Sequence, residues 1–390
     1  MRKIVSLRHN TKGEKRQLYK SLAIVGGGSR GIISATILGE IEKRTHTPIN
    51  RLFNLIGGTS TGGIQALGLT TPECIGSNRA MHSADALLKM YTSESDEIFR
   101  PNPTYDPDKT YTGWAISERL KDLTSTNTKY LSPTTAFKTK FGETSLKHAL
   151  TNILITACPF SDALKLIGEP TIRAASLVAT TIVSWFSSSV KPKAHSMGPI
   201  HQWATVFTRE GQKRIDTLKG RATFSSQKDF YMYNVASATS AAPSYFPSME
   251  CDDLKVLLDG GILYNNPANL CFIEAQSKGV NPRNMLLLSL GTGTLGPLSD
   301  RFQARSIGKT IFNLYGLWSD SYSDSIDTSL RENLSNRYYR FQKIFDGNVP
   351  DLADITPENI AFLQDAGRQL IETEEDSLNR LCRTLAPEEL

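Results

Sequence analysis

The sequence predicts an α/β fold, because two short apolar segments each lead through a glycine-rich turn into a segment with the pattern of a helix. Residues 22–25 precede the glycines of 26–31, and residues 52–56 precede the turn 58–62. Short apolar runs that end at glycine are typical of buried strands. After the first turn, apolar side chains recur at positions 33, 37, 38 and 41, which is the spacing of one helix face. A chain of 390 residues is also long enough to bury a large core.

Residues 1–19 are strongly basic, and we expect them to form a tail outside the folded domain. The first twenty residues hold seven Lys and Arg against one Glu, a balance of +6, whereas the whole chain has a net charge of +5. The basic charge therefore belongs to the tail and not to a folded groove. Two interpretations stay open: a solvated tail, or a segment attracted to anionic lipid headgroups. No apolar stretch follows the basic residues, as a secretory signal would require.

The first glycine cluster, residues 26–31, favours the binding of an anion. Glycines between a strand and a helix expose backbone N–H groups at the positive end of the helix dipole. In a serine hydrolase that anion would be the tetrahedral oxyanion. The same six residues also fit the dinucleotide pattern G-x-G-x-x-G, and a plain glycine-rich turn is a third interpretation. The dinucleotide alternative needs a carboxylate at the end of the second strand, and this strand ends instead in Gly57 and Gly58.

Ser60 is the candidate nucleophile, because it occupies the centre of a G-x-S-x-G turn between a predicted strand and helix. A serine on such a turn presents its hydroxyl at the top of a sheet. The usual triad of this fold class runs in the order Ser, Asp or Glu, and His, yet none of the six histidines lies beyond residue 201. An ordinary lipase triad is therefore not expected, and another group must accept the proton of Ser60.

Asp259 is the candidate for that group. It follows the apolar residues Leu257 and Leu258 and precedes Gly260 and Gly261, so a strand delivers a carboxylate into a glycine turn. The carboxylate could take the serine proton directly and make a two-residue dyad. An aspartate at a strand end can also serve only as a turn former or a helix cap.

In this order, the three motifs resemble those of the patatin-like phospholipase family. The stretches 238–247, 265–267 and 289–293 match as well, and the similarity extends over about residues 20–300. The resemblance implies a three-layer α/β/α sandwich of the patatin type. It also implies that the protein hydrolyses fatty-acyl esters of lipids through a Ser–Asp dyad.

The same resemblance implies a role for each site residue. Ser60 and Asp259 are the catalytic residues, as nucleophile and general base; Gly26, Gly27, Gly28 and Arg30 belong to the oxyanion hole; and Gly31, Gly58, Gly62, Gly260 and Gly261 are motif glycines. Gly27 and Gly28 would donate to the oxyanion, with Arg30 as electrostatic help. No cofactor and no metal are expected, since no cluster of metal-ligand residues accompanies the dyad.

The catalytic domain is expected to span residues 20–300 and to carry an insert at about 159–221. About sixty residues stand there where the family has a short turn between two strands. Within the insert, residues 174–190 are apolar but interrupted by Thr and Ser, and they are too short and too polar for a membrane span. A packed accessory helix, a lid or membrane-touching helix, and a partner-binding insert all remain open.

Residues 301–390 are expected to form a helical C-terminal extension. Residues 309–318 and 361–385 have helical spacing of apolar side chains, and Thr356 before Pro357 indicates the N-cap of a helix. The five cysteines are scattered and show no CxxC pair, which favours buried free thiols in a reducing compartment.

Two functions from different classes follow. The first is a lipid acyl hydrolase of the phospholipase A type, with a phospholipid or another acyl lipid as substrate. The second is a regulated or partner-binding patatin-fold protein in which the 159–221 insert has the main role. Nothing in the pattern suits nucleic acid, and the sequence does not define an oligomeric state. We expect a cytoplasmic protein that acts peripherally at membranes, with a secreted effector delivered without a cleavable signal peptide as the alternative.

Overall fold

The structure is a computed structural model. It describes residues 18–106, 127–162, 203–217, 219–251, 254–296, 311–346 and 349–387. The basic segment 1–17 and the apolar stretch 174–190 of the insert lie outside these ranges, so the interpretations given for them stay untested.

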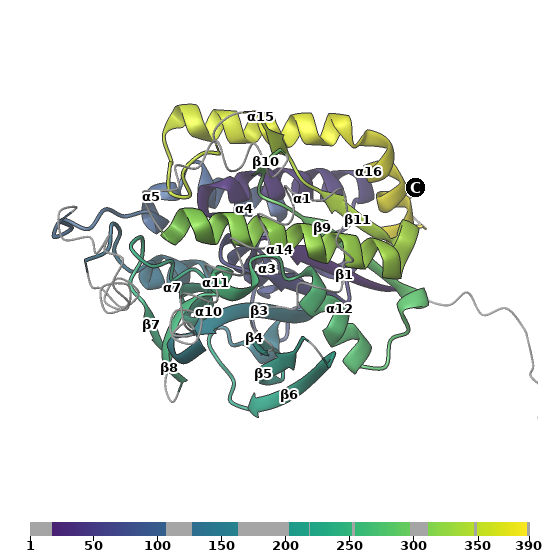
Figure 1. Cartoon of the computed structure of the whole chain (residues 1–390), viewed down its shortest axis with the longest axis horizontal. Helices are drawn as coiled ribbons and strands as arrows, with labels where there is room; N and C mark the ends of the chain where they lie inside the picture. The colour runs from purple at the N-terminus through teal and green to yellow at the C-terminus, as the bar shows by residue number, and fades with distance from the viewer. Residues whose placement is uncertain are drawn as a thin grey trace, which may run out of the picture.

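A mixed sheet of ten strands forms the centre of the described chain (Figure 1). Its parallel part has the order β11-β9-β1-β2-β3, and β4, β5 and β6 continue it in antiparallel pairs, while β8 and β7 branch from β3. The bounds are β1 (Tyr19–Ile24), β2 (Leu55–Gly58), β3 (Asn152–Pro159), β4 (Trp203–Thr208), β5 (Gly211–Asp216), β6 (Arg221–Ser226), β7 (Met249–Cys251), β8 (Leu254–Asp259), β9 (Met285–Leu290) and β11 (Tyr338–Phe341). A small parallel pair is formed by β10 (Thr294–Leu295) and β12 (Ile344–Phe345).

Helices cover both faces of the sheet and make the three layers that the resemblance implies. Because side chains alternate along a strand, Leu22 and Ile24 face one buried cluster and Ala23 faces another. The first cluster is shared with α1 (Gly31–Thr45), α3 (Thr61–Thr70), α4 (Ala84–Tyr91), α7 (Thr134–Phe141), α10 (Met232–Thr239), α15 (Pro357–Thr373) and α16 (Glu375–Leu385). The second is shared with α11 (Gly261–Tyr264), α12 (Ala268–Ser277) and α14 (Ile311–Leu334). Two short helices, α2 (Ile49–Leu52) and α5 (Ser95–Ile98), complete the described set. The predicted α/β sandwich is therefore confirmed.

The described part of the insert extends the sheet. Residues 203–216 form β4 and β5, which pair with each other and, through β4, with β3. The strand that follows the insert is β6, at the far edge of this antiparallel part. Two segments of the insert are thus strands of the central sheet.

The C-terminal region is helical, as predicted, but three of its features differ from the expectation. The helix predicted at 309–318 runs from Ile311 to Leu334, and the single helix predicted at 361–385 is two helices separated at Glu374. In addition, β11 joins the central sheet beside β9. The predicted N-cap is confirmed, because the Thr356 side chain accepts the backbone N–H of Asn359.

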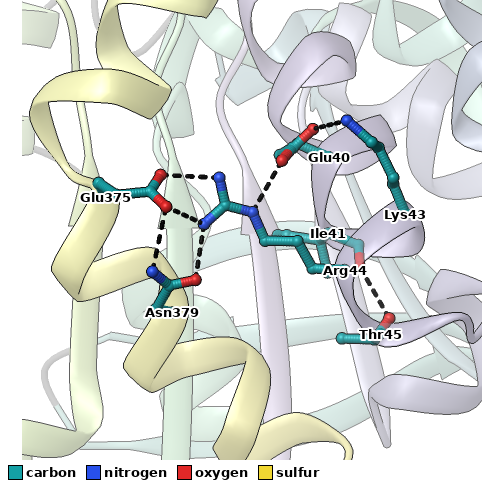
Figure 2. A network of polar contacts seen from close by, with 7 residues as sticks. All are labelled: Glu40, Ile41, Lys43, Arg44, Thr45, Glu375 and Asn379. Atoms are coloured by element: carbon teal, nitrogen blue, oxygen red, sulfur yellow. Dashed lines mark hydrogen bonds and ion pairs between the residues drawn. The ribbon is translucent and has the colours of Figure 1, made fainter. Parts of the chain in front are cut away.

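The last two helices, α15 and α16, pack against α1 (Figure 1). The break at Glu374 turns α16 toward the end of α1, where the Arg44 guanidinium reaches it (Figure 2). Arg44 donates to Glu375 at 2.7 Å and to Asn379 at 2.8 Å, and also to Glu40 of its own helix at 2.8 Å. The C-terminal region is thereby joined to the helix that follows the first glycine cluster.

Among the described residues, no helix is both long enough and apolar enough to cross a membrane.

Candidate active site

Ser60 lies on a sharp turn at the carboxyl end of β2, directly before α3. Its backbone has φ +53° and ψ −124°, a conformation that residues other than glycine rarely adopt. The turn is so tight that a Cβ on Gly58 would lie 2.2 Å from the carbonyl oxygen of Gly62. Glycine at this position therefore permits the close approach that the turn requires, and the predicted elbow is present.

Asp259 reaches Ser60 because of how β8 enters the sheet. β8 runs antiparallel to β3, and its last residue, Asp259, pairs with Ala157, beyond the level at which β2 ends. Its side chain is 6% exposed. The Ser60 hydroxyl donates a hydrogen bond of 2.7 Å to one carboxylate oxygen, and the backbone N–H of Gly261 donates to the other at 2.6 Å. Residues almost 200 positions apart are thus brought into direct contact.

Burial raises the pKa of Asp259 to about 6, and the hydrogen bonds from Ser60 and Gly261 oppose this rise. At neutral pH the carboxylate is still ionised and can accept a proton. Its raised pKa makes it a stronger base than an exposed aspartate, which titrates at about 3.9.

Exchange of Asp259 for asparagine should therefore stabilise the protein at neutral pH. The unfolded chain ionises this carboxyl at about 3.9 and the folded chain at about 6, so the cost of the buried charge grows between these pH values and persists above them. The Asp259→Asn variant should melt a few degrees above the wild type at pH 8, with a gain of about 3 kcal/mol at most. The gain should vanish near pH 4. Thermal melts at pH 4, 6 and 8 measure this.

The Ser60→Ala variant serves as the control for these melts, because it keeps the buried carboxylate and should not show the gain. A lower melting temperature of Asp259→Asn at pH 8 would contradict the assignment of Asp259 as a buried charge.

The first glycine cluster lies beside the elbow, because β1 and β2 are neighbouring parallel strands that end at the same edge. A Cβ on Gly26 would lie 3.1 Å from the Cβ of Ser60. The backbone N–H of Gly26 donates to the carbonyl oxygen of Asn265. The N–H groups of Gly27 and Gly28 form no hydrogen bond within the described part of the chain. These two groups are therefore available to an anion.

Arg30 lies against the glycine cluster itself. Its Nε donates to the carbonyl oxygen of Gly27 at 3.3 Å, and its Nη1 donates to that of Gly293 at 3.4 Å. The guanidinium therefore links the cluster to the turn after β9 and brings positive charge to this edge. Of the remaining motif glycines, Gly31 begins α1, Gly62 lies in the first turn of α3, and Gly260 and Gly261 follow Asp259.

Two threonines hold the site together, and neither was assigned a role from the sequence. The Oγ1 of Thr239 accepts the backbone N–H of Ser60 at 2.9 Å, and the Oγ1 of Thr292 donates to the carbonyl oxygen of Gly26 at 2.8 Å. Both lie in the stretches 238–247 and 289–293 that carry part of the family resemblance. The resemblance of these two stretches to the family could therefore have indicated that both threonines lie near the site.

Of the three described histidines, His82 and His148 make hydrogen bonds, and both do so away from the dyad. A ring nitrogen of His82 pairs with the carbonyl oxygen of Lys140, and one of His148 pairs with the Ser145 hydroxyl. His9, His195 and His201 lie outside the described residues.

The G-x-S-x-G turn of hydrolases holds a serine between a strand and a helix, as here, and a buried carboxylate within hydrogen-bond reach of such a serine can act as a base. The comparison with family models narrows this class. The model of the family described as patatin-like phospholipase matches residues 22–272, which is more than half of the chain. The chain belongs to the patatin-like phospholipase family, and this places the protein among lipolytic hydrolases that act on lipid substrates.

Individual relatives are distant. Patatin-17 of Solanum cardiophyllum is 24% identical, and the alignment covers 98% of this chain and 94% of that protein. The protein named probable inactive patatin-3-Kuras 1, of Solanum tuberosum, is 25% identical over 95% of this chain and 93% of its own length. Among solved structures, VipD from Legionella pneumophila is 13% identical with a TM-score of 0.31, covering 96% of this chain and 72% of that one.

Proposed function

We propose that the protein is a lipid acyl hydrolase of the phospholipase A type, with Ser60 as nucleophile and Asp259 as general base. The observation that carries the proposal is the 2.7 Å hydrogen bond from the Ser60 hydroxyl to the buried Asp259 carboxylate. Nucleophile and base must lie within hydrogen-bond reach of each other, and here they do so without a histidine between them.

The chemistry then needs two steps. Asp259 takes the proton of Ser60 as the serine oxygen attacks the ester carbonyl of the lipid, and the leaving alcohol receives that proton as the acyl–oxygen bond breaks. Asp259 next takes a proton from the water that attacks the acyl-enzyme, and it returns this proton to the Ser60 oxygen as the acyl–serine bond breaks and the fatty acid is released. The carboxylate returns to its ionised state after each step, which its pKa of about 6 permits at neutral pH.

The oxyanion formed in both steps needs hydrogen-bond donors. The N–H groups of Gly27 and Gly28 form no hydrogen bond within the described residues, and they follow Gly26, on which an added Cβ would lie 3.1 Å from the Cβ of Ser60. After a short 3-10 turn at residues 28–30, α1 begins at Gly31. The positive end of the α1 dipole favours negative charge at this place. We assign the oxyanion to these two N–H groups, with Arg30 as the nearby positive charge. Gly26 then shapes the loop without donating, because its N–H already binds Asn265.

The partner-binding alternative depended on the 159–221 insert. Residues 203–216 of this insert are strands of the catalytic sheet. This observation favours the enzyme over the partner-binding protein, because that part of the insert extends the sheet that holds Ser60 and Asp259 and so has a structural role. The peripheral contact with a membrane surface is part of the proposal and would involve the basic segment 1–19.

Product analysis tests the proposed function. The purified protein is incubated with vesicles of phosphatidylcholine and phosphatidylglycerol, with galactolipid and with triglyceride, and the products are identified by mass spectrometry. We expect free fatty acid and lysophospholipid from the phospholipids with the wild type and none with Ser60→Ala. Release should persist in the presence of EDTA. Equal release by Ser60→Ala, or no release from any lipid, would overturn the proposal.

A further inference from the structure

A short segment of the C-terminal region, residues 351–353, covers the first glycine cluster. The backbone N–H of Ser29, which directly follows Gly28, donates to the carbonyl oxygen of Leu352 at 2.7 Å. The Ser29 hydroxyl donates to the carbonyl oxygen of Asp351 at 3.3 Å. Ser29 is fully buried beneath this contact. We call residues 351–353 the strap.

The strap is held in shape by the side chain of Asp351. One carboxylate oxygen accepts the N–H of Ala353 at 2.9 Å, which closes a turn around Leu352. The other accepts the Tyr245 hydroxyl at 3.0 Å. Burial, and then the Asp351 charge, raises the pKa of Tyr245, so the phenol stays protonated as a donor. Asp351 thus fixes the direction of the Leu352 carbonyl.

Two tyrosines anchor the strap. Tyr245 lies in the stretch 238–247 that also supplies Thr239 to the Ser60 backbone. The Tyr130 hydroxyl donates to the carbonyl oxygen of Ala353 at 3.3 Å. At the other end of α1, the Arg44 contacts with Glu375 and Asn379 hold the same helix (Figure 2). The C-terminal region therefore contacts both ends of the segment 26–45, at the glycine cluster through Ser29 and at the end of α1 through Arg44.

The strap also limits which backbone N–H groups of the glycine cluster are free to bind a ligand. Successive N–H groups at the start of a helix point in a similar direction. Because Leu352 occupies the N–H of Ser29, only those of Gly27 and Gly28 stay open at this turn. From these contacts we propose that the strap positions the glycine cluster for oxyanion binding, with Asp351 as a positioning residue. This inference rests on the proposed function.

The test compares kcat and KM on p-nitrophenyl butyrate, a soluble ester that needs no membrane contact. Displacement of catalytic groups by about 1 Å can cost about 10²-fold in rate, so we expect Asp351→Ala to lower kcat about 10- to 100-fold. KM should change less than about twofold, since the oxyanion exists only in the transition state. Asp351→Asn keeps an acceptor for the Ala353 N–H and should restore most of the rate. Tyr245→Phe, which removes only one hydroxyl, should lose a few-fold in kcat.

Asp354→Ala is the matched control. Asp354 caps a turn in the same segment, where its carboxylate accepts from Thr356, but it does not hydrogen-bond to the glycine cluster. This variant should keep the kcat of the wild type. A trifluoromethyl ketone, which binds serine hydrolases as an oxyanion, should bind Asp351→Ala less tightly in proportion to the loss of kcat.

The outcomes separate the two proposals. If Ser60→Ala is inactive while Asp351→Ala and Tyr245→Phe match Asp354→Ala, the dyad stands and the positioning role of the strap is overturned. A loss that appears in KM and leaves ketone binding unchanged would also overturn it. If the wild type does not hydrolyse the ester, or Ser60→Ala does, the proposed function fails and the inference fails with it.

Discussion

Replacement of Ser60 by alanine should abolish ester hydrolysis, with a loss on the order of 10⁶-fold in kcat. Among the described residues, Ser60 is the hydroxyl that donates to the Asp259 carboxylate, whose other oxygen accepts the backbone N–H of Gly261. The Asp259→Asn variant should lose about 10⁴-fold or more, because an amide cannot take the serine proton. Stopped-time assays on p-nitrophenyl butyrate, with the folded state of each variant checked by circular dichroism, measure both losses.

Six histidine variants provide the control for the dyad. Each of His9, His46, His82, His148, His195 and His201 is changed singly to alanine, and every variant that folds should keep hydrolysing the ester. A folded histidine variant with a loss of chemistry comparable to that of Ser60→Ala would restore a triad and refute the dyad.

The Gly28→Ala variant should lose about 10²–10³-fold in kcat, the usual cost of one oxyanion donor. Two features of the structure cause this loss. Gly28 has φ +58°, which strains any other residue, and an added Cβ would lie 2.0 Å from the carbonyl oxygen of Leu352. The side chain would therefore displace either the loop or the strap above it. The melting temperature should fall as well, since the obstacle is backbone and not a flexible side chain.

Gly142 offers a matched control for this variant. It has φ +57°, nearly the same as Gly28, but no atom lies within 4 Å of an added Cβ. Gly142→Ala should cost stability on the order of 1–3 kcal/mol from backbone strain, because Gly142 has ψ −149°, and it should leave kcat unchanged. If Gly28→Ala retains full activity, the oxyanion assignment is wrong. If NAD or ATP raises the melting temperature of the wild type and not of Gly28→Ala, the dinucleotide interpretation of the cluster replaces ours.

The elements nearest the dyad could be predicted because each leaves a local signal. An apolar run that ends in glycine marks β1 and β2, and the G-x-S-x-G spacing marks the turn at Ser60. Asp259 was identified in the same way, from two leucines before it and two glycines after it. Neighbouring residues are enough to predict a site residue where the reaction requires one residue type at a particular turn.

The contacts that complete the site leave no such signal. Leu352 acts on the glycine cluster through its backbone carbonyl, which every residue possesses, across more than 300 positions of sequence. Thr292 likewise meets Gly26 only because β9 lies beside β1 in the sheet. The strands β4 and β5 fall within the predicted insert, because the family has only a short turn at this place in the sequence. The break at Glu374 was missed because apolar side chains keep helical spacing on both sides of it.

The most direct test of the central claim is to locate the covalent adduct formed with a fluorophosphonate, which reacts with activated serines. Intact-mass measurement followed by peptide mapping is carried out on the wild type, Ser60→Ala and Asp259→Asn. We expect one adduct per chain on the wild type, mapped to Ser60, none on Ser60→Ala, and greatly slowed labelling of Asp259→Asn. An adduct on another residue, or labelling of Asp259→Asn at the rate of the wild type, would contradict a Ser60–Asp259 dyad.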